Sequence, residues 1–299
     1  MQFPKEFDRA NPAPVLIAGA TASGKSALAL ELAQDQPSVV INADALQVYD
    51  GWHILTARPS EADRAQVPHL LDGHVGMHQD YSVGHWLRDV SQVLSDHSDH
   101  RPIIVGGTGL YFRALTEGLA EIPPISDKTR NQAETLEAEF GLNIFADQIN
   151  QLDAKASHTI DMLNPARTRR AWEVLTETGK SIVDWQAETP PALLPIAKTQ
   201  ALLLNSEPDW LADRINRRFD IMMDLGALDE ARRARDTFWD PTAVSCQAIG
   251  AAELIDHLNS QTDLDTAIDL AKTKTRQFAK RQRTWFRSRM RNWTVIELK

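Results

Sequence analysis

The chain has 299 residues, of which 42% are hydrophobic and 24% charged, with a formal net charge of −9. This is the composition of an ordinary globular protein with one large domain or two smaller ones, and it excludes a low-complexity or fibrous chain. A single cysteine, a polar N-terminus without signal-peptide order and the lack of a long apolar run favour a cytoplasmic protein with no membrane partner.

The first predicted elements are a strand, a glycine loop and a helix. An apolar run at residues 14–18 precedes G-A-T-A-S-G-K-S, and a helix-forming run at residues 27–33 follows it. Glycines let backbone N–H groups face phosphate oxygens, and the helix adds its positive N-terminus. Lys25 would reach the outer phosphates, and the Ser26 hydroxyl would hold Mg²⁺. The alternative is a plain glycine turn. The predicted phosphate-binding residues are Gly19, Ala20, Thr21, Ala22, Ser23, Gly24, Lys25 and Ser26.

Two further predicted strands end in residues suited to catalysis. Residues 39–41 lead directly into Asp44, and residues 103–105 lead into the G-G-T-G that contains Thr108. In a parallel sheet these positions face the same crevice as the phosphate loop. Asp44 would therefore act as a general base or bind Mg²⁺, with a helix cap as the alternative. The glycines around Thr108 indicate a close approach of backbone and hydroxyl to a ligand.

Strand-like runs at residues 15–17, 39–41, 103–105, 201–204 and 293–296 alternate with helical stretches. This order predicts an α/β fold with a phosphate-loop NTPase-like parallel sheet flanked by helices. Proline pairs near both ends of residues 121–191 mark a helical insertion. We therefore expect a core of residues 1–120 and 192–299 and a separate helical subdomain.

The C-terminal part of the chain is strongly basic. Residues 272–291 contain nine Lys or Arg and no acid, and they include Lys280, Arg281 and Arg283. The spacing predicts a helix with one buried face, formed by Ala271, Thr275, Phe278, Gln282 and Trp285. Its other faces suit a nucleic-acid backbone, and a solvated helix surface is the alternative.

Two function classes fit these features in part. A small-molecule kinase would use the loop for ATP but would not need the basic helix, and no strand ends in the Asp that many such enzymes use for Mg²⁺. A non-catalytic RNA-binding module would leave Asp44 and the loop unexplained.

Seven motifs together resemble the tRNA dimethylallyltransferase family over about residues 14–287. The motifs are G-A-T-A-S-G-K-S at 19–26, N-A-D-A-L-Q-V-Y at 42–49, V-P-H at 67–69, V-G-G-T-G-L-Y at 105–111, R-I-N-R-R-F-D at 214–220, A-I-G at 248–250 and T-R-Q-F-A-K-R-Q-R-T-W at 275–285. The resemblance implies transfer of a dimethylallyl group from dimethylallyl diphosphate to the N6 amine of the adenosine 3′ of the anticodon. It further implies Mg²⁺ as cofactor, the tRNA anticodon arm as partner and no obligate protein partner. A related alternative is a prenyltransferase acting on free adenine nucleotides, which would need neither the insertion nor the basic helix.

The resemblance also assigns roles to residues. Asp44 matches the general base, Thr108 a residue near the reacting centre, and Arg214 and Arg218 the cations that neutralise the diphosphate. The loop would then bind this diphosphate rather than ATP, and Gln47 would read the adenine N6/N7 edge. The tRNA-contacting positions that the resemblance implies are Asp44, Ala45, Leu46, Gln47, Thr108, Arg130, Ala166, Arg167, Thr168, Arg169, Arg170, Gln247, Ala248, Ile249, Gly250, Ala251 and Ala252. The basic helix adds Lys280, Arg281 and Arg283.

The chain departs from the family pattern at a few positions. Ala20 replaces a usual proline, Ala45 a usual serine and Leu70 a common second histidine. The pair at residues 251–252 replaces a tyrosine and a basic residue, which affects one expected RNA contact and not the reaction.

Overall fold

The computed structural model describes residues 3–4 and 7–298, which form two compact units. The first unit comprises residues 1–116 and 193–299, apart from the few positions not described, and the second comprises residues 117–192. The second unit is the helical insertion expected at residues 121–191, with bounds a few residues wider.

The first unit is built on a six-stranded sheet in which every neighbouring pair of strands is parallel. The strand order is β3-β2-β4-β1-β5-β6. This confirms the predicted α/β class. The strands are β1 (Val15–Gly19), β2 (Ser38–Asn42), β3 (His69–Leu70), β4 (Arg101–Gly106), β5 (Gln200–Ser206) and β6 (Thr294–Leu298).

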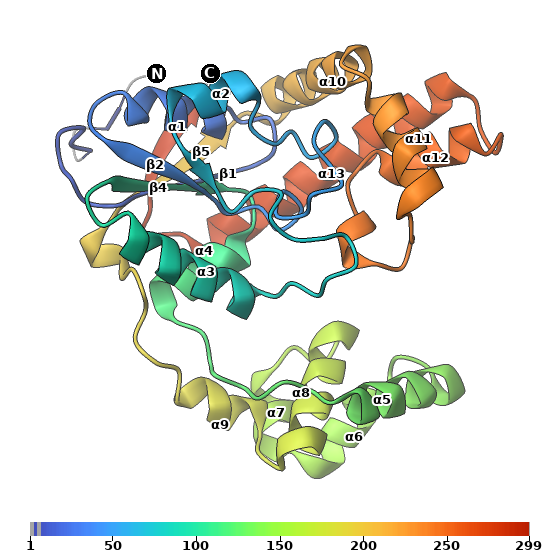
Figure 1. The fold of residues 1–299 in the computed structure, drawn as a ribbon. Coiled ribbons are helices and arrows are strands. Elements are labelled where there is room, and N and C mark those ends of the chain that lie inside the picture. The colour runs from blue at the N-terminus through green and yellow to red at the C-terminus, as the bar shows by residue number, and fades with distance from the viewer. Residues whose placement is uncertain (1–2, 5–6, 299) are drawn as a thin grey trace. The chain divides into compact units, whose positions relative to one another are not determined.

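The register of the sheet places the predicted catalytic loops together. Ala18 of β1 pairs with Gly106 of β4, and Asn42 of β2 pairs with Val105 of β4. The segments after β1, β2 and β4 therefore leave the sheet at one edge, which is where ligands bind in open parallel sheets. Figure 1 shows these three strands side by side.

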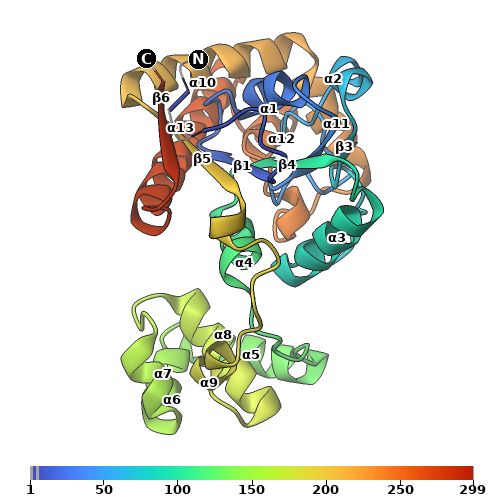
Figure 2. The ribbon, with the colours of Figure 1, turned by 90° about the vertical axis from the view of Figure 1, so that its left-hand side faces the viewer.

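Helices cover both faces of the sheet (Figures 1 and 2). On one face, α1 buries Leu28 and Leu32 against the strands. On the other face, α3 and α4 contribute Trp86 and Phe112, and the end of α13 contributes Phe286. The helices of the first unit are α1 (Lys25–Ala33), α2 (Glu61–Gln66), α3 (Val83–Asp96), α4 (Gly109–Glu117), α10 (Pro208–Asp224), α11 (Ala227–Thr237), α12 (Ala251–Leu258) and α13 (Leu264–Arg289), with 3₁₀ turns at Ile196–Lys198 and Val244–Cys246.

A second apolar core joins α10–α13 to the segment that follows β2. Trp52, Leu55, Phe219 and Leu254 are all buried in it, and the indole N–H of Trp52 donates to the Ser245 carbonyl at 2.8 Å. We call α10–α13 with the connecting 3₁₀ turn the helical lobe. The sequence predicted helical stretches between the last two strands, with a basic helix at the end, but not that they would form one wall of the site.

The insertion is a small helical unit with its own core. Ile125, Phe145, Ile149 and Trp172 are buried in it. Asn164 caps α8, whose first residue is Pro165, and Gly179 ends that helix with a left-handed φ of 67°. Its helices are α5 (Asp127–Phe140), α6 (Ile144–Leu152), α7 (Ala154–Thr159), α8 (Pro165–Thr178) and α9 (Ile182–Ala187).

Two details differ from the sequence-based expectation. The short strand β3 was not predicted, because two residues are too few for a periodic signal. The basic helix α13 buries Ala279 and Phe286 in place of Phe278 and Trp285, which are only half-buried. A helix of 26 residues contacts different neighbours along its length, so one straight apolar stripe does not describe it.

Candidate active site

The phosphate loop connects β1 to α1 with the geometry expected of an anion site. Ala22 and Gly24 adopt left-handed conformations with φ of 62° and 94°. Alternating right- and left-handed backbone turns successive N–H groups toward a common concavity. Ala22 has no glycine freedom, so this conformation is held by the surrounding loop. Lys25 begins α1, and its ammonium donates to the Ala20 carbonyl at 2.8 Å, across the mouth of the loop.

The surroundings of Lys25 lower the pKa of its ammonium group. Removal from bulk water lowers the pKa of Lys25 to about 8. The negative charge of Asp44 raises this pKa, and the positive charge of Arg218 lowers it further. Desolvation also lowers the pKa of Arg218, and the charge of Arg214 adds to this effect. Asp44 is the carboxylate that opposes this lowering of the pKa at both Lys25 and Arg218. Such a site gains most when a polyanion enters it.

The two predicted arginines lie one turn apart on α10 and differ in exposure. Arg214 is exposed, stacks over the Trp210 ring at 4.7 Å and donates from Nε to the Ala22 carbonyl at 2.9 Å. Arg218 is half-buried and lines the cavity beside the loop. The structure therefore brings both to the phosphate loop, one at its rim and one inside.

Asp44 is fixed by a turn just beyond β2. Its backbone N–H donates to Asn42 Oδ1 at 2.9 Å, and its own Oδ1 accepts the Leu46 N–H at 3.0 Å. Asn42 Nδ2 completes the turn by donating to the carbonyls of Asp44 and Leu71, at 3.0 and 2.9 Å. One carboxylate oxygen thus orients the side chain, while Oδ2 has no partner among the described residues. Asp44 precedes a turn rather than an α-helix, so the capping alternative does not hold.

Thr108 follows β4 and faces the same cavity as Asp44. Its hydroxyl oxygen accepts the Ala45 N–H at 2.9 Å, which leaves the hydroxyl hydrogen available to a ligand. The neighbouring glycines have a different purpose from the one expected. A Cβ on Gly106 would lie 2.0 Å from the Ala43 carbonyl oxygen, and one on Gly109 would lie 2.2 Å from the Trp285 ring. These glycines admit protein neighbours rather than a ligand.

Gln282 of α13 is a site residue that sequence reasoning did not identify as one. This buried side chain accepts the Thr21 N–H at 2.9 Å and donates to the Gly107 carbonyl at 2.9 Å. It thereby ties the phosphate loop to the loop after β4. The basic helix therefore takes part in the cavity beside the phosphate loop, which the sequence did not predict, because Gln282 and Phe278 line that cavity. A polar residue on the apolar face of the predicted helix was the available signal.

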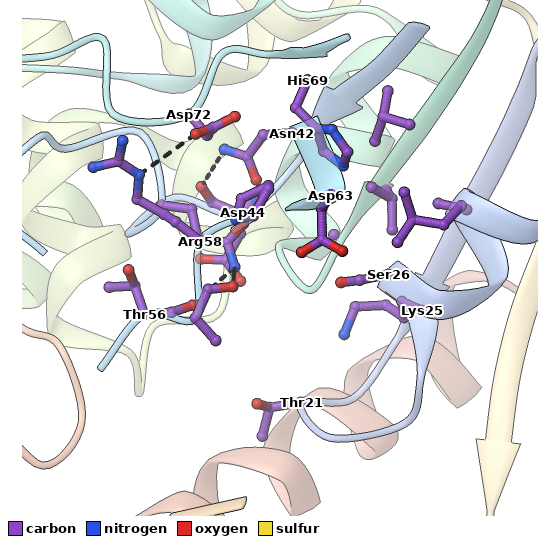
Figure 3. A pocket seen from close by; sticks show the side chains of 18 of the residues that line it. Thr21, Lys25, Ser26, Asn42, Asp44, Thr56, Arg58, Asp63, His69 and Asp72 are labelled. Atoms are coloured by element: carbon purple, nitrogen blue, oxygen red, sulfur yellow. Dashed lines mark hydrogen bonds and ion pairs between the residues drawn. The ribbon is translucent and has the colours of Figure 1, made fainter. Parts of the chain in front are cut away.

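Two adjoining cavities make up the candidate site, and they share Thr21, Asp44, Thr56, Arg218 and Phe278. The smaller, about 140 Å³, is lined by Lys25 and Ser26. Figure 3 shows this pair on one side of it, with Asp44, Thr56 and Arg58 on the other. The larger encloses about 460 Å³ and is walled by apolar side chains of the helical lobe. Its volume is in the range of small-molecule sites. The arrangement pairs an anion-binding corner with an apolar chamber.

The amide of Gln47 has a fixed orientation at the edge of the smaller cavity. Its Nε2 donates to the carbonyls of Thr56 and Ala57, at 2.8 and 3.2 Å. Both amide hydrogens are therefore used inside the protein. The expected two-bond reading of adenine N6 and N7 is not available in this arrangement, because Gln47 has only its oxygen to offer.

Some of the remaining predicted tRNA-contacting residues of the first unit are buried, and others are accessible. Ala248, Gly250 and Ala251 are buried and support the helical lobe, whereas Gln247 is exposed at the larger cavity. Ala252 is half-buried; Ala45, Leu46 and Ile249 are half-buried and line that cavity.

Part of the basic face of α13 is used in ion pairs within the protein. Lys272 pairs with Asp220 at 2.6 Å, and Lys274 pairs with the buried Glu253. Lys280 and Arg281 are exposed, and Arg281 also borders the larger cavity. Arg283 is half-buried, and its Nε has no hydrogen-bond partner among the described residues.

In the insertion, the predicted cluster lies on the first turns of α8. Thr168 is buried and donates to the Pro165 carbonyl at 3.0 Å, so its side chain belongs to the core. Arg169 is held by Glu137 at 2.6 Å and Glu173 at 3.0 Å. Exposed members of the set are Ala166, Arg167, Arg170 and, on α5, Arg130.

Ser26 fits a role in Mg²⁺ binding by the chemistry of its donor. Its hydroxyl lies on the first turn of α1 beside Lys25, is exposed and has no hydrogen-bond partner among the described residues. A hydroxyl oxygen next to a phosphate site suits this hard cation, which keeps much of its own water and takes ligand phosphate oxygens. Among the residues that the structure describes, no group of three or more His, Cys, Asp or Glu side chains forms a metal site. Nor does any described helix have the length and apolarity needed to cross a bilayer.

Comparison with protein-family models gives two matches. The family model described as IPP transferase matches residues 47–289, and that described as Isopentenyl transferase matches residues 13–70. A tRNA dimethylallyltransferase of Cereibacter sphaeroides (strain KD131) is 55% identical over 296 residues, which cover 99% of this chain and 92% of the relative. One of Dinoroseobacter shibae is 54% identical and covers 95% and 94%.

Solved structures give the same likeness. A tRNA isopentenylpyrophosphate transferase from Bacillus halodurans superposes with a TM-score of 0.67 at 32% identity, covering 96% of this chain and 90% of that one. A eukaryotic dimethylallyltransferase described as acting on tRNA superposes with a TM-score of 0.81 at 25% identity, covering 95% and 73%.

Proposed function

This chain belongs to the IPP transferase family and is a transferase, and on that premise we propose that it moves a dimethylallyl group from dimethylallyl diphosphate to tRNA. The acceptor in this proposal is the N6 amine of the adenosine 3′ of the anticodon. The observation that carries it is the shared edge of the two cavities, where the Asp44 carboxylate stands between a cationic phosphate loop and an apolar chamber. A diphosphate, a short alkenyl group and a base each find a matching surface there.

The bond-making step uses Asp44 as base. The N6 lone pair is delocalised into the adenine ring, so the amine is a poor nucleophile unless its proton is removed as it attacks. N6 forms a bond to C1 of the dimethylallyl group, the C1–O bond breaks, and the diphosphate leaves with the electron pair. The N6 proton passes to Asp44 Oδ2, the oxygen that the turn leaves without a partner.

The leaving diphosphate is stabilised by the cations of the loop. Lys25 and Arg218 face its growing negative charge from inside the cavity, and Arg214 does so from the rim. Backbone N–H groups of the loop add donors that are already oriented before the reaction. Mg²⁺, held by the Ser26 hydroxyl, would supply further charge neutralisation to the phosphate oxygens when bound.

The target base must leave its stack to reach Asp44. Extruding one nucleotide costs a few kcal/mol, which contacts elsewhere on the RNA have to supply. Exposed cations on α8 and α13 are available for backbone contacts. The Thr108 hydroxyl and the Gln47 oxygen are oriented groups at the cavity that can then meet the ligands.

A labelled-donor assay tests this function. The protein is incubated with dimethylallyl diphosphate labelled in its alkenyl group, together with tRNA, AMP or ATP in separate reactions. We expect label in tRNA and its recovery, after digestion, on N6 of one adenosine. Replacement of that adenosine by guanosine should abolish incorporation. Label on AMP would support the free-nucleotide prenyltransferase instead, and conversion of ATP to ADP would support a kinase.

The basic helix should contribute affinity without specificity. Replacing Lys280 and Arg281 with alanine should weaken tRNA binding about equally for tRNAs of different sequence, because phosphate contacts position the RNA without reading it. The slope of log affinity against log salt should flatten by up to about one unit per lost contact. Equilibrium titrations of fluorescent tRNA at several salt concentrations measure both effects.

Lys272→Ala is the matched control for that experiment. Lys272 lies on the same helix but is paired with Asp220 at 2.6 Å. Its removal should leave the salt slope unchanged. If the protein with both Lys280 and Arg281 replaced also binds tRNA like the unmodified protein, α13 presents a solvated face, and the RNA contacts lie on α8.

A further inference from the structure

Glu230 is a buried carboxylate that does not itself line the cavities. Glu230 lies on helix α11 beside the buried Ala227, Ala231 and Ala234, and it is only 3% exposed. Both oxygens accept backbone N–H groups from the segment after β2. Oε1 accepts from His53 at 2.7 Å and from Ile54 at 2.9 Å, and Oε2 accepts from Leu55 at 2.8 Å. Three charge-assisted hydrogen bonds therefore fix one short turn.

A guanidinium holds the backbone beside this turn through its carbonyl groups. Arg58 Nη1 donates to the carbonyls of Asp50 at 3.2 Å and Trp52 at 3.3 Å, and the buried Asp72 orients Arg58 from 3.4 Å. The turn itself is closed by hydrogen bonds from the Ala57 N–H to the Ile54 carbonyl and from the Arg58 N–H to the His53 carbonyl, at 2.9 and 3.0 Å. Glu230 thus holds the turn at residues 53–57 through backbone N–H groups, and Arg58 holds the backbone just before it through carbonyl oxygens.

This turn determines which end of the Gln47 amide faces the cavity. Its last two carbonyls, of Thr56 and Ala57, both accept from Gln47 Nε2. Only an NH₂ group can satisfy two carbonyl oxygens, so the amide cannot rotate by half a turn while the turn stays in place. No described residue donates to Gln47 Oε1, and the residue lines the smaller cavity together with Asp44.

We propose that Glu230 is a positioning residue that holds the turn at residues 53–57. The turn makes Gln47 a group that can only accept hydrogen bonds, and Gln47 therefore selects a target base with an exocyclic amine. This inference rests on the proposed function. Glu230 itself touches neither substrate. Its effect reaches the target base through the backbone of the turn and the Gln47 amide.

The chemistry of the bases gives the selection. The adenine N6 amine has two hydrogens, of which one can go to Asp44 Oδ2 and the other to Gln47 Oε1. A guanine in the same position presents a carbonyl oxygen, O6, to these two acceptors, and no hydrogen bond forms. A buried polar group left unpaired is costly, so the wrong base is rejected. With a loosened turn, the Gln47 amide can rotate and donate its NH₂ to O6.

Glu230→Gln is the decisive variant. The glutamine oxygen can still accept two of the three backbone N–H groups, but the glutamine NH₂ would face the third N–H and cannot accept from it. Binding of two anticodon stem-loop RNAs, with adenosine or guanosine at the target position, is measured by fluorescence anisotropy. We expect the preference for adenosine to fall by roughly tenfold. Binding of inorganic diphosphate should change less than twofold. In a Gln47→Ala background the same substitution should shift the preference no further.

Asp263→Ala is the matched control. Asp263 caps α13 in the same helical lobe by accepting the Thr266 N–H at 2.8 Å, far along the chain from the turn. It should lower the melting temperature without altering the preference. If Glu230→Gln proves unfolded at the assay temperature, Arg58→Lys loosens the clamp from its other side and should produce the same shift.

Two results would overturn the inference: an unchanged preference in a folded Glu230→Gln protein, or an equal shift in the Gln47→Ala background. Both are binding measurements and do not depend on turnover. Failure of the unmodified protein to transfer labelled dimethylallyl to tRNA would instead reject the proposed function, so the two failures are distinguishable.

Discussion

Asp44→Asn should lower kcat by about 10²–10⁴-fold, the usual range for loss of a general base. The substitution keeps the shape of the side chain and can keep the hydrogen bond from the Leu46 N–H to Oδ1. It removes the basic oxygen that would take the N6 proton. Affinities for tRNA and for the donor should change by only a few fold. Single-turnover rates with labelled donor, together with separate binding titrations, test each part.

Asp63→Asn provides the control for charge alone. Asp63 lines the same cavity, but its Oδ2 accepts from the Ser60 N–H at 2.9 Å and the Ser60 hydroxyl at 2.7 Å in a capping box. Loss of this charge should reduce kcat by less than about fivefold, since capping contributes to stability rather than to proton transfer. Equal losses in the two variants would show that the cavity needs negative charge, and Asp44 would no longer be the base.

Five of the six strands could be read from the sequence because each contains a short run rich in apolar and β-branched residues, whereas β3 could not. β1 and β2 are buried at all five positions, as strands covered on both faces are, and each is bounded by turn residues. The order of the strands could not be read in the same way. Nothing in the sequence of β4 states that it pairs with both β1 and β2, because pairing depends on contacts between distant segments.

From the residue pattern alone, the site was predictable where a residue follows a strand and not where it acts from a distant helix. Arg214 and Arg218 on α10 were assigned only by the family resemblance. Lys25, Asp44 and Thr108 each lie in the segment that follows a strand, so the parallel topology brings them together. Gln282 and Glu230 reach the same region from α13 and α11. Each lies on an otherwise apolar helix face, and that signal marks a buried polar group without naming its partner.

The binding of a diphosphate should weaken as the pH rises through about 8, because the pKa of Lys25 in the ligand-free protein is lowered to about 8 by desolvation. Below that pH the ammonium is charged and attracts the phosphate oxygens. Above it, binding must first restore the proton. Affinity should then fall by up to about tenfold per pH unit, until the pH reaches the higher pKa of Lys25 in the complex. Calorimetric titration with dimethylallyl diphosphate between about pH 7 and pH 9.5 measures this profile.

Two variants separate Lys25 from the titration of the ligand itself. Lys25→Ala should weaken donor binding by roughly 10–100-fold at pH 7, the value of a hydrogen bond to a charged group, and should retain only the pH dependence of the phosphate. Lys25→Arg keeps a charge at every pH tested and should give an equally flat profile at higher affinity. A profile for the unmodified protein that parallels both variants would mean that Lys25 stays fully charged in the free site. The electrostatic cost of placing Lys25 and Arg218 beside one phosphate loop would then be smaller than their burial implies, and the donor's affinity would have to come mainly from the loop N–H groups.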